Sequence, residues 1–524
     1  MGPMNSHPSL ALTAVCLAAL LFGLEISSVP VILPVLESRL HAGFQDLQWV
    51  MNAYTIACTT VLMATGTLAD RYGRRRVFAI TVAAFGIASL LCGLAPNTPA
   101  LIAARFLQGL AGGAMFICSI AILSHQFPDG AARGRAFAVW GVVAGIGLGF
   151  GPVIGGAIVA VATWEWVFLV HAPLALLGLV LIRVGVAESR DPEAHRQRLD
   201  LAGIGTLSLG VLALTSLITQ GAGFGWTSAA SLGLAAVSVL SLLAFVRVEL
   251  TQPHPMFDFS VFRIRGFSGA ILGCIGMNCS YWPFMIYLPL YFSAGFGYDT
   301  TTTGLMLLVY TVPFLVMPPI AQWLLLRLQA RVVIPAGLGL IGLGFLAMKL
   351  GTGFAHLGGW TVLPGALLAG IGLGLTTTPA TNMTTASVPA NRAGMASGMD
   401  VSARLITLAL NIAVMGLVLV AGILSALDTA LGPAPGAARL RAVAEQLAGG
   451  DVAGARGALV ALDATAATDA VLHTAVTRGF GWVLLCGALG ALLTAALSLA
   501  VLTSRPAPSP GLQLATRDPQ PPPR

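Results

Sequence analysis

The chain has 524 residues; 56% of them are hydrophobic and only 9% are charged. A soluble domain carries about 25% charged residues, so this chain lacks the polar surface that a water-soluble globule needs. The formal net charge is +7, but the basic residues lie in short loops between apolar stretches rather than on one face of a domain. This distribution argues against a nucleic-acid partner and predicts helices that face lipid.

Apolar stretches long enough to cross a bilayer recur along the whole chain. A helix needs about 20 apolar residues to cross the hydrocarbon core, so we expect an all-α membrane protein with about fourteen spans. They lie near 10–36, 46–69, 77–95, 98–124, 134–160, 165–187, 201–220, 228–248, 266–293, 300–326, 331–351, 359–383, 397–425 and 479–503.

The seven cysteines all fall inside these apolar stretches, and none forms a CxxC pair. We therefore expect small buried side chains, without a disulfide framework or a metal site. No nucleotide-binding loop, G-x-S-x-G or HExxH motif occurs, and the eight histidines are dispersed. The sequence thus predicts neither a cofactor nor an enzyme.

Two polar connectors, 183–200 and 247–265, divide the spans into groups of six, two and six. We expect one six-helix bundle over 1–187 and a second over 266–503. Two inserted spans with their connectors would occupy 188–265. Paired repeats are a recurrent transporter design, and the substrate site lies at their interface.

Short loops on one side of the predicted membrane hold most of the arginines, including the basic run in loop 66–76. The positive-inside rule places that side in the cytoplasm, so we expect both termini to be cytoplasmic. The Ala-rich segment 427–478 is then extracytoplasmic, and its scattered charges favour one or two amphipathic helices. The Pro-rich tail 504–524 has no apolar periodicity and is expected to be disordered.

The loop between the second and third spans reads GTLADRYGRRR. Its glycines permit a tight turn and a close helix approach, and its carboxylate can bind arginines or a helix N-terminus. The pattern resembles the G-x-L-A-D-R-x-G-R signature of the major facilitator superfamily, which implies two six-helix bundles that this loop latches together on the inner side. A positive-inside anchor would explain the arginines but not the acid and the glycines. The resemblance assigns the gating role to Gly66, Asp70, Arg71, Gly73, Arg74 and Arg75.

The fourth span reads LIAARFLQGLAGGAMF, with Arg105 one turn before Gln108. A charge near the bilayer centre costs about 2.5–3.5 kcal/mol on insertion scales, so Arg105 must face the bundle interior and have a partner. The R-x-x-Q-G pattern resembles the superfamily's fourth-span motif, which is associated with proton transfer. A purely structural arginine is the alternative.

The fifth span reads GVVAGIGLGFGPVIGGAI. Glycines at every fourth position leave one helix face as bare backbone, so a neighbouring helix can pack closely. Because GPxxGG follows this GxxxG face, the span resembles the motif that marks antiporters within the superfamily. A packing face without a transport role is the alternative. The residues of the resemblance are Gly145, Gly149, Gly151, Pro152, Gly155 and Gly156.

The first span contains LEISSVPVILP and places Glu25 well inside an apolar segment. An intramembrane carboxylate is a functional candidate by default. The segment resembles the L-D-x-T-I-V-N-V-A-L-P motif of the fourteen-span drug:proton antiporter family, with Glu25 for Asp, Ser27 for Thr and Pro30 for Asn. The resemblance implies that Glu25 couples proton movement to transport, and a structural hydrogen bond is the alternative.

Four more polar residues within spans are candidates. Tyr54 lies in a segment that resembles the family's second-span start, and His171 stands where the family has Asn. Asp400 also replaces Asn, and Arg404 follows it on the same helical face, so the two can simply pair. The expected proton-coupling residues are Glu25, Arg105 and Asp400, and the expected substrate-binding residues are Glu25, Gln108, Tyr54 and His171.

Together these motifs predict a proton-coupled antiporter that exports small hydrophobic or cationic compounds as one half rocks against the other. The substitutions at Glu25, Pro30 and Glu165 motivate the alternative of a narrow-specificity exporter of one antibiotic or metabolite. A proton symporter fits the GPxxGG pattern less well. The expected partners are the small-molecule substrate, protons and the lipid bilayer of a bacterial cytoplasmic (inner) membrane, with no obligatory protein partner.

Overall fold

The computed structural model describes residues 7–40, 44–128, 130–189, 200–252, 257–389, 392–431, 437–460 and 469–503. Within these ranges the regular structure consists of α-helices and short 3-10 helices, without strands. The predicted all-α fold is therefore confirmed. The tail 504–524, predicted to be disordered, lies outside the described residues.

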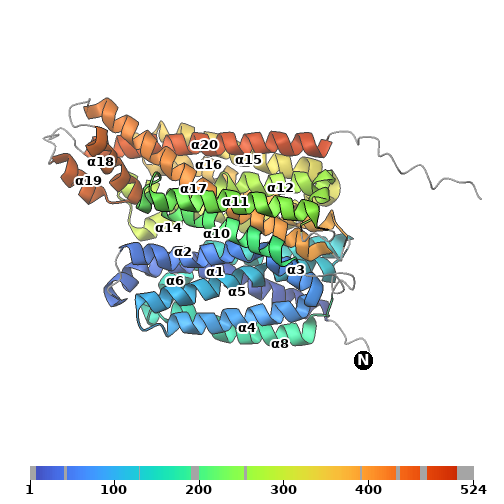
Figure 1. The fold of residues 1–524 in the computed structure, drawn as a ribbon. Helices are drawn as coiled ribbons and strands as arrows, with labels where there is room; N and C mark the ends of the chain where they lie inside the picture. The colour runs from blue at the N-terminus through green and yellow to red at the C-terminus, as the bar shows by residue number, and fades with distance from the viewer. Residues whose placement is uncertain are drawn as a thin grey trace, which may run out of the picture.

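The helices of the first half run back and forth along a common direction (Figure 1). They are α1 (Pro8–Leu40), α2 (Phe44–Thr60), α3 (Leu62–Tyr72), α4 (Arg74–Gly93), α5 (Thr98–Gln126), α6 (Gly130–Val161), α7 (Trp166–Leu169) and α8 (His171–Gly185). The inserted pair consists of α10 (Leu201–Phe224) and α11 (Ala229–Thr251). Asp200 and Ser228 cap these two helices by accepting a backbone N–H bond in the first turn.

The second half begins with the short 3-10 helix η1 (Phe259–Arg263). Its other elements are α12 (Arg265–Asn278), α13 (Tyr281–Phe296), α14 (Thr300–Leu328), α15 (Ala330–Thr352), η2 (Ala355–Leu357), η3 (Gly359–Val362), α16 (Leu363–Ala386), α17 (Ala393–Leu431), α18 (Ala437–Gly449), α19 (Val452–Val460) and α20 (Asp469–Thr503).

Thirteen helical segments within the described ranges are long and apolar enough to cross a membrane. The predicted second span is not among them, and it is split at Val61 into α2 and α3, which are 17 and 11 residues long. The hydroxyls of Thr59 and Thr60 both donate to the carbonyl of Ile56 at 2.8 Å, and such bonds bend helices. Ser208 of α10 donates to the carbonyl of Thr60 at 2.9 Å. Counted as one broken span, α2 and α3 complete the fourteen.

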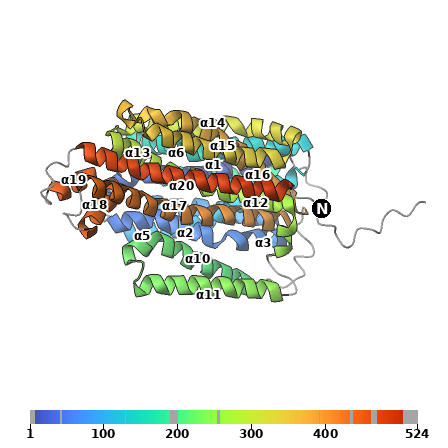
Figure 2. The same ribbon diagram turned by 90° about the horizontal axis from the view of Figure 1, so that it is seen from above.

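The inserted pair lies at the side of the bundle (Figure 2). α11 packs on α10, and α10 contacts both α2 of the first half and α17 of the second half. The two halves also meet directly, where α6 packs on α14 and where α3 and α5 pack on α17. The helices that carry Arg105, the glycine run and Asp400 therefore lie at the interface between the halves.

α18 and α19 lie at one end of the bundle, opposite the start of α1 and the end of α20 (Figure 1). α18 buries Leu440, Val443 and Leu447 in the core of the second half, and it exposes Arg441 and Glu445. An amphipathic helix, as predicted for the Ala-rich segment, is thus present as α18.

Candidate transport site

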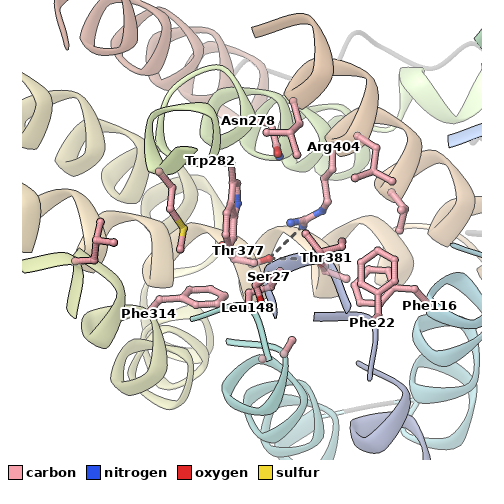
Figure 3. Close-up of a pocket in the computed structure, with 18 of the residues that line it drawn as sticks. Phe22, Ser27, Phe116, Leu148, Asn278, Trp282, Phe314, Thr377, Thr381 and Arg404 are labelled. Atoms are coloured by element: carbon pink, nitrogen blue, oxygen red, sulfur yellow. Dashed lines mark hydrogen bonds between the residues drawn. The ribbon is translucent and has the colours of Figure 1, made fainter. Parts of the chain in front are cut away.

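A cavity of about 830 Å³ lies between the two halves, lined by α1, α5 and α6 on one side and by α12, α13, α14, α16 and α17 on the other. A cavity of this size can bury most of a drug-sized molecule. Most of its lining is apolar; the aromatic members are Phe22, Phe116, Trp140, Trp282 and Phe314. The polar members are Ser27, Asn278, Thr303, Thr377, Thr381, Asp400 and Arg404, most of which Figure 3 shows.

The motif at 66–76 closes one end of the interface between the halves. Asp70, near the end of α3, accepts hydrogen bonds from the backbone N–H groups of Gly394 (3.2 Å) and Met395 (3.1 Å) at the N-terminus of α17. The same carboxylate pairs with Arg74 at 2.7 Å. Because N–H groups at a helix N-terminus carry partial positive charge, Asp70 caps α17 across the interface.

Glycine is required where α3 crosses α17. A Cβ atom added at Gly66 would lie 2.4 Å from the carbonyl oxygen of Gly394, and one added at Gly394 would lie 2.5 Å from the Asp70 carboxylate. Gly73, between α3 and α4, has a φ of +106°, which side chains rarely adopt. The motif's glycines therefore serve a close helix crossing and a tight turn.

Arg75 of the motif holds the loop within the first half. The Arg75 guanidinium donates to the carbonyl of Arg183 at 2.9 Å, and the Arg75 backbone N–H donates to Glu188 at 3.1 Å. These contacts tie the loop to the chain at the end of α8. The Arg71 guanidinium lies 5.5 Å from the centre of the Tyr72 ring.

A second polar contact joins the halves near the same end. Arg133, near the start of α6, is 6% exposed and donates to Asn382 Oδ1 (2.5 Å) and Thr385 Oγ1 (2.7 Å) of α16. It also donates to the carbonyl of Ser124 in its own half at 3.0 Å. Asn382 in turn donates to Gln322 of α14 at 3.1 Å. Nothing in the sequence distinguished Arg133 from the other loop arginines, whose charge the positive-inside rule already explains.

The cavity extends away from these contacts. Its lining includes Gly156 near the end of α6, and Thr303 and Gly304 near the start of α14. The other ends of α6 and α14 lie on the side of Arg133 and Gln322. The structure thus shows the halves in contact at the Asp70 end and the cavity directed towards the opposite end.

The glycine run of α6 packs against two helices. On one face, a Cβ atom added at Gly145 would lie 2.8 Å from Phe314 of α14. On another face, a Cβ atom added at Gly151 would lie 1.7 Å from Ser27 Oγ of α1. The Ser27 hydroxyl donates to the carbonyl of Gly147 at 2.8 Å, so α1 and α6 approach at backbone distance.

The remaining residues of this motif differ in their surroundings. A Cβ atom at Gly155 would lie 3.0 Å from Ser28 of α1, whereas one at Gly149 would meet Thr311 only at an ordinary 3.8 Å. Gly156 lines the cavity. α6 continues through Pro152, but the side chain of Pro152, like that of Pro30 in α1, lies outside the described part of the structure.

Glu25 lies in a fully buried polar cluster of the first half. Its Oε1 atom pairs with Nη1 of Arg105 on α5. Arg105 also donates to Gln108 Oε1 at 2.7 Å and to the carbonyl of Val50 at 3.0 Å, and Gln108 donates to Ser89 at 2.9 Å. Arg105 therefore has the partners that a buried charge requires.

His171 and Tyr54 complete this cluster. His171 Nε2 lies 3.5 Å from Glu25 Oε2, and neither atom has a hydrogen-bond partner among the residues that the structure describes. The Arg105 guanidinium lies 4.5 Å from the centre of the Tyr54 ring, within cation–π range. Glu25 Oε2 is thus an open acceptor in a buried site, and a proton bound there would face His171.

Asp400 lies in a second buried cluster, in the second half. Its Oδ2 atom accepts from Arg404 Nε at 2.9 Å and from Thr381 at 3.3 Å. Its Oδ1 atom accepts from the Cys274 thiol at 2.9 Å and from Thr384 at 3.3 Å. The pairing expected from the spacing of Asp400 and Arg404 is confirmed. Cys274 differs from its expected role as a packing residue, because its thiol is a hydrogen-bond donor here.

The two clusters are placed differently with respect to the cavity. Ile26 and Ser27 line it, so α1 forms part of the wall while Glu25 lies behind that wall. Direct contact between Glu25 and substrate therefore stays a prediction. The described residues that line the cavity include Asp400 and Arg404 but not five of the predicted site residues, Glu25, Tyr54, Arg105, Gln108 and His171.

Residues 15–411 match the family model of the Major Facilitator Superfamily. The chain belongs to this superfamily. It is therefore a multi-span membrane transporter and not an enzyme, as its fold and its relatives agree. The cavity between the two halves is consistent with this assignment.

Curated relatives include drug and antibiotic efflux and resistance proteins. The multidrug resistance protein Stp of Mycobacterium tuberculosis is 33% identical over 425 residues, which cover 81% of this chain and 78% of that protein. The cephamycin export protein CmcT of Amycolatopsis lactamdurans is 34% identical, with coverages of 75% and 82%. The puromycin resistance protein pur8 of Streptomyces alboniger is 32% identical, with coverages of 78% and 81%.

Solved structures share the fold at low sequence identity. The human organic anion transporter MFSD10 aligns with a TM-score of 0.58 at 15% identity, covering 89% of this chain and 100% of that chain. The proton:xylose symporter XylE aligns with a TM-score of 0.57 at 15% identity, with coverages of 87% and 95%. At this identity the likeness shows the fold alone, and it confirms the predicted major facilitator fold.

Proposed function

We propose that the protein exports small hydrophobic compounds across a bacterial cytoplasmic membrane in exchange for protons. Relatives whose names record drug or antibiotic export and resistance support the class of substrate. The apolar, aromatic wall of the cavity supports it independently. The excess of arginine in the loops on the Asp70 side supports an orientation with both termini in the cytoplasm.

The observation that supports proton coupling is the unequal bonding of the two Glu25 carboxylate oxygens. Its Oε1 atom joins α1 to α5 through Arg105, whereas its Oε2 atom is buried without a hydrogen-bond partner among the described residues. Protonation of this carboxylate weakens the ion pair between the two helices. Because Ile26 and Ser27 follow directly in the cavity wall, a small movement of α1 changes the surface that the substrate touches.

Alternating access requires the contacts at the Asp70 end to break and the opposite end to close. The breaking contacts are those of Asp70 with the N-terminus of α17 and of Arg133 with α16. We propose that these contacts form a two-part cytoplasmic gate. One proton moving across 100 mV provides about 2.3 kcal/mol, which sustains a substrate gradient of more than tenfold.

The test is substrate-induced proton flux in proteoliposomes that contain a trapped pH-sensitive dye. A panel of hydrophobic antibiotics and dyes is added to the proteoliposomes. We expect some of these compounds to drive proton movement through the native protein, which the trapped dye reports. Glu25→Gln should abolish this flux and retain a folded protein. A matched control is Glu445→Gln on the exposed face of α18, which should leave the flux intact. Unchanged proton-driven transport in Glu25→Gln would refute the proposal.

The same panel separates broad from narrow specificity. A narrow-specificity exporter is favoured by the fixed polar group at the cavity wall, where Asp400, Arg404 and Thr381 are mutually bonded. Such a group can orient one class of compound. Proton flux with a single member of the panel would support a narrow-specificity exporter. Proton flux with many unrelated members would support a multidrug exporter.

A further inference from the structure

The charges that face the cavity come from one ion pair. Among the described residues that line it, Asp400 and Arg404 are the ionisable ones. The buried carboxylate of Glu25 lies behind the wall and is paired with Arg105. The charge that a substrate meets is therefore decided by how Asp400 and Arg404 are arranged.

The Asp400 carboxylate at the cavity wall is fully buried, and hydrogen-bond donors occupy both of its oxygens. Its side chain is 0% exposed. Both oxygens accept hydrogen bonds: Oδ2 from Arg404 and Thr381, and Oδ1 from Cys274 and Thr384. A cationic substrate could not reach this carboxylate without displacing one of these partners.

The Arg404 guanidinium is the more accessible member of the pair. Its side chain is 14% exposed, and it reaches the cavity wall beside Thr381 (Figure 3). Nε and Nη2 are engaged by Asp400 and Thr381. Nη1 has only the Met277 sulfur at 3.8 Å as a hydrogen-bond partner among the residues that the structure describes. A guanidinium N–H group is a strong donor, and the thioether is a weak acceptor.

We propose that Arg404 binds the acidic or acceptor-bearing group of an aromatic substrate, so that this cavity takes hydrophobic anions in preference to permanent cations. The inference rests on the proposed function and specifies its substrate class. It reverses the expectation of cationic substrates that the family resemblance suggests. A charge-assisted hydrogen bond in a dry site is about twice as strong as a neutral one, and a permanent cation would meet a like charge instead.

The test compares two probes that differ in one group. 1-Anilinonaphthalene-8-sulfonate is an aromatic anion, and N-phenyl-1-naphthylamine is the same ring system without the sulfonate. Both are titrated by equilibrium dialysis against the full-length protein in nanodiscs, with empty nanodiscs subtracted. The ratio of the two dissociation constants isolates the contribution of the negative charge from that of the rings.

The charge variants change this ratio in predictable directions. The double variant Asp400→Asn/Arg404→Gln removes both charges without stranding either one, and it should weaken the anion about tenfold relative to the neutral probe. In Asp400→Asn, no carboxylate competes with the anionic probe for the Arg404 guanidinium. Binding of the anionic probe should therefore become tighter relative to that of the neutral probe. Arg404→Lys retains the cation and should keep most of the preference.

Two results would overturn the inference. The first is an unchanged ratio in the folded double variant. The second concerns tetraphenylphosphonium, a permanent aromatic cation. The inference fails if the native protein binds this cation more tightly than the sulfonate and if Asp400→Asn loses the binding of the cation. Binding in nanodiscs needs no proton gradient, so failure of proton-driven export with a shifted ratio would refute only the export proposal. Intact export with an unchanged ratio would refute only this inference.

Discussion

The two halves of the molecule each bury one acid–arginine pair, and the pairs are built differently. Glu25 and Arg105 lie on separate helices, α1 and α5, and both are almost completely buried behind the cavity wall. Asp400 and Arg404 lie four residues apart on α17, and the Arg404 guanidinium reaches the cavity. Protonation of Glu25 weakens the ion pair that joins α1 to α5, whereas the ion pair of Asp400 with Arg404 lies within α17 and joins no second helix by itself. The first arrangement suits energy coupling, and the second suits substrate recognition.

The pairs also differ in how many partners each acid keeps. Glu25 has one oxygen without a hydrogen-bond partner among the described residues, while both oxygens of Asp400 are bonded. A buried charge is costly when it loses its partner. Removing the arginine should therefore damage the first pair more than the second.

The largest expected effect tests that difference directly. Arg105→Met strands Glu25 and should cost about 3–5 kcal/mol of stability, whereas Arg404→Met should cost less because Cys274, Thr381 and Thr384 still bind Asp400. Unfolding of the two variants in nanodiscs is followed by steric trapping. The double variant Glu25→Gln/Arg105→Met should recover most of the loss. Equal losses for the two single variants would remove the distinction between the pairs.

The next effect concerns the close contact between α1 and α6. Gly151→Ala places a methyl group against Ser27, where a Cβ atom would lie 1.7 Å from the hydroxyl, and should cost about 1–3 kcal/mol through overpacking. Gly149→Ala is the matched control, because its Cβ atom would meet Thr311 at 3.8 Å. Thermal unfolding and proton flux are measured together. Adding Ser27→Ala should partly restore Gly151→Ala, and no difference between the two glycine variants would refute the close contact.

A third expected effect concerns the closed end of the interface. Arg133→Gln removes charged hydrogen bonds to α16 and should shift the equilibrium by about tenfold towards opening at the Asp70 end. Asp70→Asn should act in the same direction while leaving substrate binding intact. Distances between spin labels on the two halves report the populations. Arg135→Gln, an exposed arginine on the same helix, should leave them unchanged. A shift of equal size in Arg135→Gln would show that loss of a positive charge explains the effect and that the hydrogen bonds of Arg133 do not.

The smallest expected effect lies outside the spans, at Asp258 and Arg392. Burial raises the pKa of Asp258, but hydrogen bonds from Ser260 and Arg392 outweigh it and leave the pKa below the ordinary value of 3.8. The two side chains are 2.7 Å apart and partly exposed, 49% for Arg392 and 29% for Asp258, so solvent screening limits the contribution of the pair to about 0–1 kcal/mol. Because the folded pKa is lowered, this contribution is present at neutral pH and is lost as the pH falls through the folded pKa.

Arg392→Gln should therefore lower the unfolding temperature slightly at pH 7 and should not change it once Asp258 is protonated. Arg441→Gln breaks the more exposed pair with Glu445 on α18 and serves as the control with no expected effect. A pH-independent loss in Arg392→Gln would show that the side chain acts by packing and not through its charge.

Local features of the structure could be predicted from the sequence. The spans followed from composition, because only long apolar helices satisfy their backbone inside a bilayer. The pairing of Asp400 with Arg404 followed from their spacing, because residues four apart share a helix face. The crossing glycines followed from the signature around Asp70. The break at Val61 did not follow, because hydroxyl groups bend a helix only in some contexts.

The sequence by itself therefore determined that this chain spans a membrane, that it has a major facilitator pattern and that it buries acids and arginines. Only the tertiary structure decided which acid faces the cavity and which lies behind the wall. Spans that are apolar all round give no periodic signal for the face that points inward. The partners that matter most, Glu25 with Arg105 and Arg133 with Asn382, are 80 and 249 residues apart, so packing of distant helices creates both contacts.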